Sequence, residues 1–153
     1  MDKYERTIKT WDKLAEKYQD VFMDLSLYDD SYDAFCALLL KKDATILELG
    51  CGPGNITKYL LNKRPDYKIH ATDAAPSMLA LAEKNNPTAT FEVLDCRNIS
   101  VLKNKFDAVV CGFCLPYLSE TDCFKLIKDS FQLLLHAGLV YISMIDGIIA
   151  NLS

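Results

Sequence analysis

Three glycines within five residues, Gly50, Gly52 and Gly54, directly follow the short apolar run 45–49. Glycine adopts positive φ angles and has no Cβ, so this spacing predicts a sharp turn whose backbone is open to a neighbouring group. A helix is expected over about 54–63, because Arg64 and Pro65 then interrupt the pattern. A strand, a glycine turn and a helix in succession are typical of the first unit of a parallel α/β sheet.

The rest of the chain repeats this alternation of short apolar runs and helical segments, which predicts βαβ units. The expected strands are 45–49, 68–72, 90–94, 106–111 and 139–144. The expected helices among them are 54–63, 76–84 and 119–136, with Gly138 as the stop after the last. The predicted fold class is therefore α/β, a doubly wound and mostly parallel sheet with helices on both faces.

Residues ahead of the first strand carry a different pattern. Apolar residues at helical spacing predict one helix over 3–23 and a second over 31–41. Trp11, Tyr18 and Phe22 fit either a packed core or a cover over a ligand, whereas Tyr4 is expected in a solvated first turn. With 153 residues and no linker, we expect a single domain, 1–153, with a helical lid or cap at 1–42 and an α/β core at 43–153.

Composition narrows the function classes. The net charge is −4, so binding to nucleic acid, which needs a basic face, is not expected. No signal peptide is visible, and the longest apolar run, 131–144, is too short and interrupted to span a bilayer. Beside Cys111 and Cys114, no second pair of cysteines has the spacing of metal ligands, so we expect reduced thiols, no metal site and a cytoplasmic location.

Acidic residues end the second and third expected strands. The carboxyl ends of parallel strands meet at one edge of the sheet, where ligands bind in open α/β folds. Asp73 is placed to accept both hydroxyls of a ribose, and Asp95 to accept from an exocyclic amine such as that of adenine. Glu48, just ahead of the glycine turn, suits a ligand that carries an ammonium group. Met78 and Cys96 are expected to offer apolar faces to a ring.

Glu48-x-Gly50-x-Gly52-x-Gly54 resembles motif I, (D/E)xGxGxG, of the class I S-adenosylmethionine-dependent methyltransferases. The resemblance extends over about residues 11–146 and implies a Rossmann-like fold, S-adenosylmethionine as cofactor and S-adenosylhomocysteine as product. It implies contacts of the glycine turn with methionine and ribose, of Asp73 with ribose and of Asp95 with adenine. The segment 11–18 resembles the lid helix of small-molecule members. The expected cofactor-binding residues are Glu48, Gly50, Cys51, Gly52, Asn55, Asp73, Ala74, Met78, Asp95, Cys96, Cys111 and Tyr18.

Two other motifs fit this sequence less well. A nicotinamide-binding GxGxxG fingerprint requires glycine at position 55, where this chain has Asn55. Cys111 and Cys114 have the spacing of a thioredoxin-like pair, but Pro116 and a helix starting near Ser119 argue against the helix N-terminus that such a pair needs. Packed or pocket-lining thiols are the simpler interpretation.

The chemistry implied by the resemblance is direct displacement at a sulfonium methyl group, for which alignment matters most. No residue is assigned a catalytic role; Tyr18, Tyr117 and His136 are candidates, with His136 expected at a helix C-terminus. A small-molecule acceptor of unknown identity is expected.

The end of the sequence leaves a second interpretation open. The family's sixth and seventh strands have no counterpart in the sequence, and the fifth strand is left as an open sheet edge. That edge suggests a homodimer. It also suggests a non-catalytic or truncated cofactor-binding domain that acts through a partner.

Overall fold

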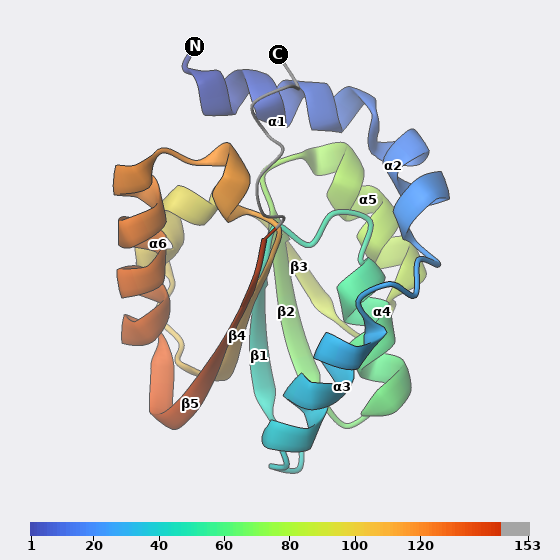
Figure 1. Cartoon of the computed structure of the whole chain (residues 1–153), viewed down its shortest axis with the longest axis vertical. Coiled ribbons are helices and arrows are strands. Elements are labelled where there is room, and N and C mark those ends of the chain that lie inside the picture. Colours follow the sequence, from blue (N-terminus) through green and yellow to red (C-terminus); the bar gives the residue numbers. More distant parts are fainter. Residues whose placement is uncertain (145–153) are drawn as a thin grey trace.

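The structure of the chain is a computed structural model that describes residues 1–144 (Figure 1). Its α-helices are α1 (Lys3–Lys13), α2 (Ala15–Phe22), α3 (Asp29–Leu38), α4 (Asn55–Lys63), α5 (Pro76–Asn85) and α6 (Glu120–Gln132). The strands are β1 (Thr45–Leu49), β2 (Lys68–Asp73), β3 (Thr90–Val93), β4 (Phe106–Gly112) and β5 (Leu134–Ser143), with short 3₁₀ helices η1 (Cys96–Val101) and η2 (Leu115–Tyr117). Within these residues no helix has the length and apolar character needed to cross a membrane.

The five described strands form one sheet in the order β3-β2-β1-β4-β5, and every neighbouring pair is parallel. The chain runs outward from β1 to β3, then crosses back to β4, which makes the sheet doubly wound. Its central strands β1 and β4 are almost wholly buried, as their continuous apolar runs predict. The predicted α/β fold class is confirmed.

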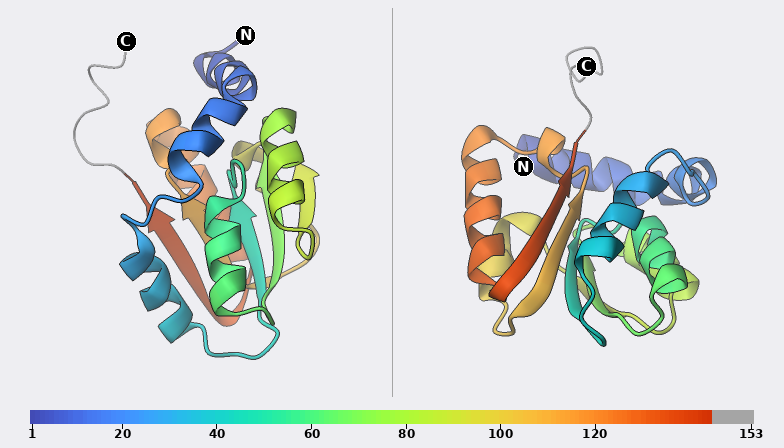
Figure 2. Two further views of the ribbon diagram at one scale, coloured as in Figure 1. Left: turned by 90° about the vertical axis from the view of Figure 1, so that its right-hand side faces the viewer. Right: turned by 60° about the horizontal axis from the view of Figure 1, so that its bottom comes forward.

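Helices cover both faces of the sheet (Figures 1 and 2). α3, α4 and α5 lie on one face, and α6 with η1 lies on the other. Alternate residues of each strand supply the two apolar clusters beneath them; in β1, Ile46 belongs to the first cluster and Leu47 to the second. The two layers hold the carboxyl ends of the strands in a fixed line.

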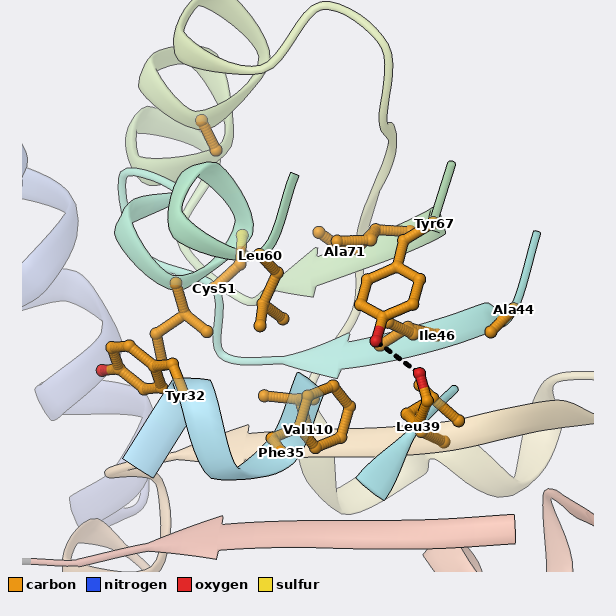
Figure 3. Close-up of a cluster of buried hydrophobic side chains, with 14 of the residues drawn as sticks. Tyr32, Phe35, Leu39, Ala44, Ile46, Cys51, Leu60, Tyr67, Ala71 and Val110 are labelled. Carbon is orange, nitrogen blue, oxygen red and sulfur yellow. Dashed lines mark hydrogen bonds between the residues drawn. The ribbon is translucent and has the colours of Figure 1, made fainter. Parts of the chain in front are cut away.

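Figure 3 shows that α3 belongs to this packed framework. Tyr32 and Phe35 of α3 are buried against the cluster that contains Ile46, and the Tyr67 hydroxyl donates to the Leu39 carbonyl over 2.7 Å. α3 therefore packs on the sheet and takes no part in covering its carboxyl edge. Within the predicted cap, 1–42, only α1 and α2 take that place.

α1 and α2 cross above the carboxyl ends of the strands (Figures 1 and 2). The predicted single helix over 3–23 is divided at Leu14, whose backbone leaves the helical region (φ −99°, ψ 9°). α1 begins with a capping box, in which the Asp2 side chain accepts from the Glu5 N–H and Glu5 accepts from the Asp2 N–H. The break lets the two helices follow the curved edge of the sheet.

The last strand differs from the prediction. α6 ends at Gln132, and β5 starts at Leu134, so His136 lies in β5 and the helix predicted over 119–136 is too long. Gly138 does not end a helix. A Cβ at that position would lie 3.0 Å from the carbonyl oxygens of Asp107 and Leu135, in a bulged stretch where the β4–β5 register shifts.

Candidate functional site

A cavity open to solvent lies between the carboxyl edge of the sheet and the two N-terminal helices. The helices α1 and α2, called the lid below, contribute Tyr4, Thr7, Ile8, Trp11 and Tyr18. The glycine turn after β1, the end of β2 and the start of α5 contribute Gly50, Gly52, Asp73, Ala74, Ala75 and Met78. The segment after β3 and the end of β4 with the residues that follow it contribute Leu94, Cys96, Gly112, Phe113, Cys114 and Tyr117. The cavity is at the edge where the sequence predicts a ligand.

The glycine turn forms the floor of the cavity with backbone in the left-handed region that favours glycine. Gly50, Gly52 and Gly54 have φ angles of +60°, +55° and +84°. A Cβ at Gly50 would lie 2.5 Å from the Sγ of Cys114, and one at Gly52 would lie 3.5 Å from the ring of Tyr18. The turn therefore leaves room for a ligand to approach the main chain closely.

Asp73 is the acidic group that the cavity presents. Its Oδ2 accepts from the Gly52 N–H and its Oδ1 from the Ala75 N–H, both over 2.9 Å. Burial raises the pKa of the Asp73 carboxyl above its ordinary value, and these backbone donors act in the opposite direction. Each oxygen keeps a further lone pair, so the side chain can still accept from two hydroxyl groups of a ligand.

Glu48 does not line the cavity. Its side chain is 1% exposed and accepts a hydrogen bond from the Thr57 hydroxyl, beneath the first turn of α4. Burial raises the pKa of Glu48 to about 8. Alternation along β1 directs this side chain toward α4, and its contact with an ammonium group of a ligand stays a prediction.

Four more of the predicted residues lie outside the cavity lining. Cys51 is packed in the core beneath α4, and Cys111 in the cluster on the opposite face. Asn55 opens α4 and lines a separate hollow with Asp29 and Tyr59. Both Asp95 oxygens are engaged by Arg97, at 2.7 Å for Oδ2 and 3.1 Å for Oδ1. Contact of these side chains with a cofactor stays a prediction.

Aromatic rings enclose the cavity on the lid side. Trp11 makes edge-to-face contacts with Tyr18 (5.4 Å between ring centroids) and Tyr117 (5.9 Å), and Tyr18 stacks on Phe22 at 4.4 Å. Burial raises the pKa of Tyr18 to about 12. Trp11 and Tyr18 also pack against Met78 and Ala75, so these rings combine the two roles that the sequence left open.

Part of the lining was missed from the sequence. Tyr4, Thr7 and Ile8 face the cavity, and the prediction of a solvated first turn at Tyr4 is wrong. Tyr4, Ile8 and Trp11 follow a spacing of four and three residues, the signal of one helix face. That spacing was available, but the surrounding charged residues obscured it.

A sequence profile of the methyltransferase domain family matches residues 46–138, which include the glycine turn, Asp73 and the strand ends that line the cavity. The chain belongs to the methyltransferase domain family. This confirms the resemblance to class I S-adenosylmethionine-dependent methyltransferases that motif I carries.

The methyltransferase domain is similar to curated methyltransferases. A putative methyltransferase, 235L, of Invertebrate iridescent virus 6 is 31% identical over 112 residues, 73% of this chain and 40% of that protein. Trans-aconitate 2-methyltransferase of Variovorax paradoxus is 33% identical over 108 residues, 71% of this chain and 41% of that protein. The chain thus spans about two fifths of the length of these relatives.

Solved structures of methyltransferases share the fold. The amino pentose methyltransferase CalS10 of Micromonospora echinaspora, solved with S-adenosylmethionine, has a TM-score of 0.66 and 25% identity, covering 76% of this chain and 48% of CalS10. Phosphoethanolamine N-methyltransferase 1 of Haemonchus contortus has a TM-score of 0.75 at 18% identity, covering 94% of this chain and 33% of that protein.

Proposed function

We propose that this methyltransferase domain binds S-adenosylmethionine in the cavity beneath α1 and α2 and transfers its methyl group to a small-molecule acceptor. The observation that carries the proposal is the pairing of Asp73 with the glycine turn: a half-buried carboxylate with free lone pairs accepts from the Gly52 N–H, beside Gly50, where a Cβ has no room. This arrangement fits a ribose and a methionine chain, and CalS10 was solved with the same cofactor.

Different residues line the two ends of the cavity. Gly50 and Gly52 lie next to Asp73, where ribose and methionine would be held; Met78 and Cys96 offer their apolar sides at the end expected to hold adenine. When bound, S-adenosylmethionine supplies a methyl group already activated on a sulfonium. The chain then has to align the acceptor and exclude water, which the rings of Trp11 and Tyr117 favour.

An acceptor would approach from the side of β4. Phe113 and Tyr117 lie just past the end of that strand and line the cavity. The aromatic walls and the cover of α1 and α2 support a small acceptor with an apolar surface. The relatives named above act on aconitate and amino pentose substrates, so their likeness does not choose among acceptors.

Asp73→Asn tests the cofactor site. Loss of the charged acceptor for two hydroxyl groups is expected to weaken S-adenosylhomocysteine binding by about 1.5–3 kcal/mol, roughly 10- to 150-fold, in calorimetric titrations. The wild-type chain is expected to bind; a dissociation constant above the millimolar range would refute the site. For a binding-competent chain, methyl transfer from the cofactor to panels of small amines, phenols and carboxylates then tests the acceptor class.

A further inference from the structure

Arg97 connects the end of β3 to the first turn of the lid helix. Its guanidinium donates to Asp95 from Nη2 (2.7 Å) and to Asp2 from Nη1 (2.9 Å). The same group lies 4.4 Å above the centre of the Tyr4 ring. Asp2 is the N-cap of α1 and Tyr4 is in its first turn, so one side chain fastens α1 to the sheet.

The fastened turn is also a wall of the cavity. Tyr4 lines it together with Cys96, and the Tyr4 hydroxyl lies 3.2 Å from the Cys96 Sγ. Arg97 itself does not line the cavity. Any effect of Arg97 on a bound cofactor must therefore be transmitted through α1.

Few other contacts hold α1 against the rest of the domain. It contains no fully buried residue; beyond Tyr4, its apolar contacts come from half-buried Ile8 and Trp11, which pack beside Met78, and Trp11 also contacts the Tyr117 ring. One further polar bond runs from the Ser77 N–H to Asp12 over 2.8 Å. A helix with so few buried contacts can leave the sheet without unfolding it, and its polar attachments then make up a large share of the docking energy.

We infer that Arg97 is a positioning residue that latches α1 over the adenine end of the cavity and thereby sets how fast the cofactor leaves. The inference rests on the proposed binding of S-adenosylmethionine in this cavity. Opening requires that the contacts of Arg97 with Asp2 and Tyr4 break, whereas its contact with Asp95 persists.

The two ion pairs of Arg97 differ in exposure. The Asp2 side chain is 52% exposed and that of Asp95 is 19% exposed. Salt screens the more exposed pair more effectively, so the lid side of the latch is the one that weakens as ionic strength rises. Cofactor release is therefore expected to quicken with salt.

A second arginine cluster provides a matched control. Arg64 pairs with Asp66 at 2.9 Å and lies 4.6 Å above the ring of Tyr67, the same chemistry at the same sequence spacing between the charges. It stands ahead of β2, at the amino edge of the sheet, and does not line the cavity. Arg64 has one carboxylate partner and also donates to the Leu39 and Lys41 carbonyls, so Arg64→Met removes a comparable arginine cluster without touching the lid.

The test compares the full chain with its Asp2→Asn, Arg97→Met and Arg64→Met variants. Asn caps a helix as well as Asp does, so Asp2→Asn removes the charge of the latch, keeps the cap and leaves the Asp95–Arg97 pair intact. Trp11 is the only tryptophan of the sequence and lines the cavity, so its fluorescence reports release of S-adenosylhomocysteine in stopped-flow dilution. Hydrogen exchange of the α1 amides reports docking without ligand.

The latch predicts roughly 5- to 10-fold faster release in Arg97→Met, about 2- to 5-fold in Asp2→Asn, and less than about 1.5-fold change in Arg64→Met. Raising the salt concentration is expected to speed release from the wild type and to have little effect on Asp2→Asn. Should Arg97→Met fail to fold, the release rate measured for Asp2→Asn is the test of the latch. Wild-type release rates in both latch variants, or an equal effect in Arg64→Met, overturn the inference.

Failure of the proposed function is distinguishable from failure of the latch. A wild-type chain that does not bind S-adenosylhomocysteine refutes the proposed cofactor site. The latch is then judged by hydrogen exchange, in which Asp2→Asn and Arg97→Met should expose the amides of residues 3–13 faster than Arg64→Met does. Equal protection in all variants contradicts it.

Discussion

Glu48 is a buried acid whose neighbour is the hydroxyl of Thr57. With its pKa raised to about 8, the folded protein holds a proton that the unfolded chain releases above its ordinary pKa near 4.5. The stabilising contribution of this protonated group is thus complete below about pH 4.5 and is lost as pH rises toward 8.

Glu48→Gln is expected to remove this dependence, since the amide oxygen can accept from Thr57 at every pH. Between pH 5 and pH 8, the free energy of unfolding of the wild type should fall relative to that of the variant by on the order of 3 kcal/mol. Urea denaturation at several pH values measures the difference. Parallel pH profiles for the two proteins would show that Glu48 is ionised when folded.

At the residue scale, the sequence was most informative where backbone conformation decided the outcome. The three glycines of the turn and Asp73 at the strand end were placed correctly, because positive φ and strand alternation are local properties. The contact of Asp95 with an adenine amine stays a prediction, and its carboxylate pairs with Arg97, only two residues away. A preference for one partner over another depends on three-dimensional packing that the spacing of residues does not contain.

At the level of a whole element, the start of β5 also depends on three-dimensional packing that local sequence does not contain. Its start was predicted five residues too late, because the segment 134–138 has no apolar alternation and continues the helical spacing of α6. The pairing partner Phe106, which lies opposite Leu134, is what makes this segment a strand. The strongly patterned elements β1, β4 and α4, each bounded by clear turn residues, were predicted to within a residue or two.

Two substitutions in the bulge of β5 are expected to change the stability of the protein in opposite directions. Ala137 has a φ of +60°, so Ala137→Gly is expected to relieve strain and stabilise the protein by up to about 1 kcal/mol. Gly138→Ala should destabilise it by about 1–3 kcal/mol, because the new methyl group would press on the Asp107 and Leu135 carbonyls. Urea midpoints for the two variants check the signs; a stable Gly138→Ala would mean that the bulge yields easily.

At the scale of the whole molecule, β5 is an edge strand, paired on one side with β4 in the described part of the chain. Exposed strand edges favour pairing with another chain, and a two-fold axis would join two copies through the same edge. We propose a homodimer of this kind. It is expected to dissociate on dilution in sedimentation velocity experiments.

Val140→Lys places a charge near that edge and should shift the equilibrium toward the monomer by at least about tenfold, since a charge on an edge strand opposes pairing. Circular dichroism of the variant controls for loss of fold. A wild-type chain that stays monomeric at high concentration, or a dimer that Val140→Lys leaves intact, would exclude the edge as the interface.

The latched helix α1 also has a consequence for the order in which the chain folds. Its first turn is bound through residues 92 and 95 positions further along the sequence. At cellular rates of synthesis, roughly 5 to 20 seconds separate the appearance of α1 from that of its partners. The sheet must assemble before these long-range contacts can form. α1, which is synthesised before the strands, is therefore the last of these elements to reach its place, and the cavity closes only when the rest of the domain has folded.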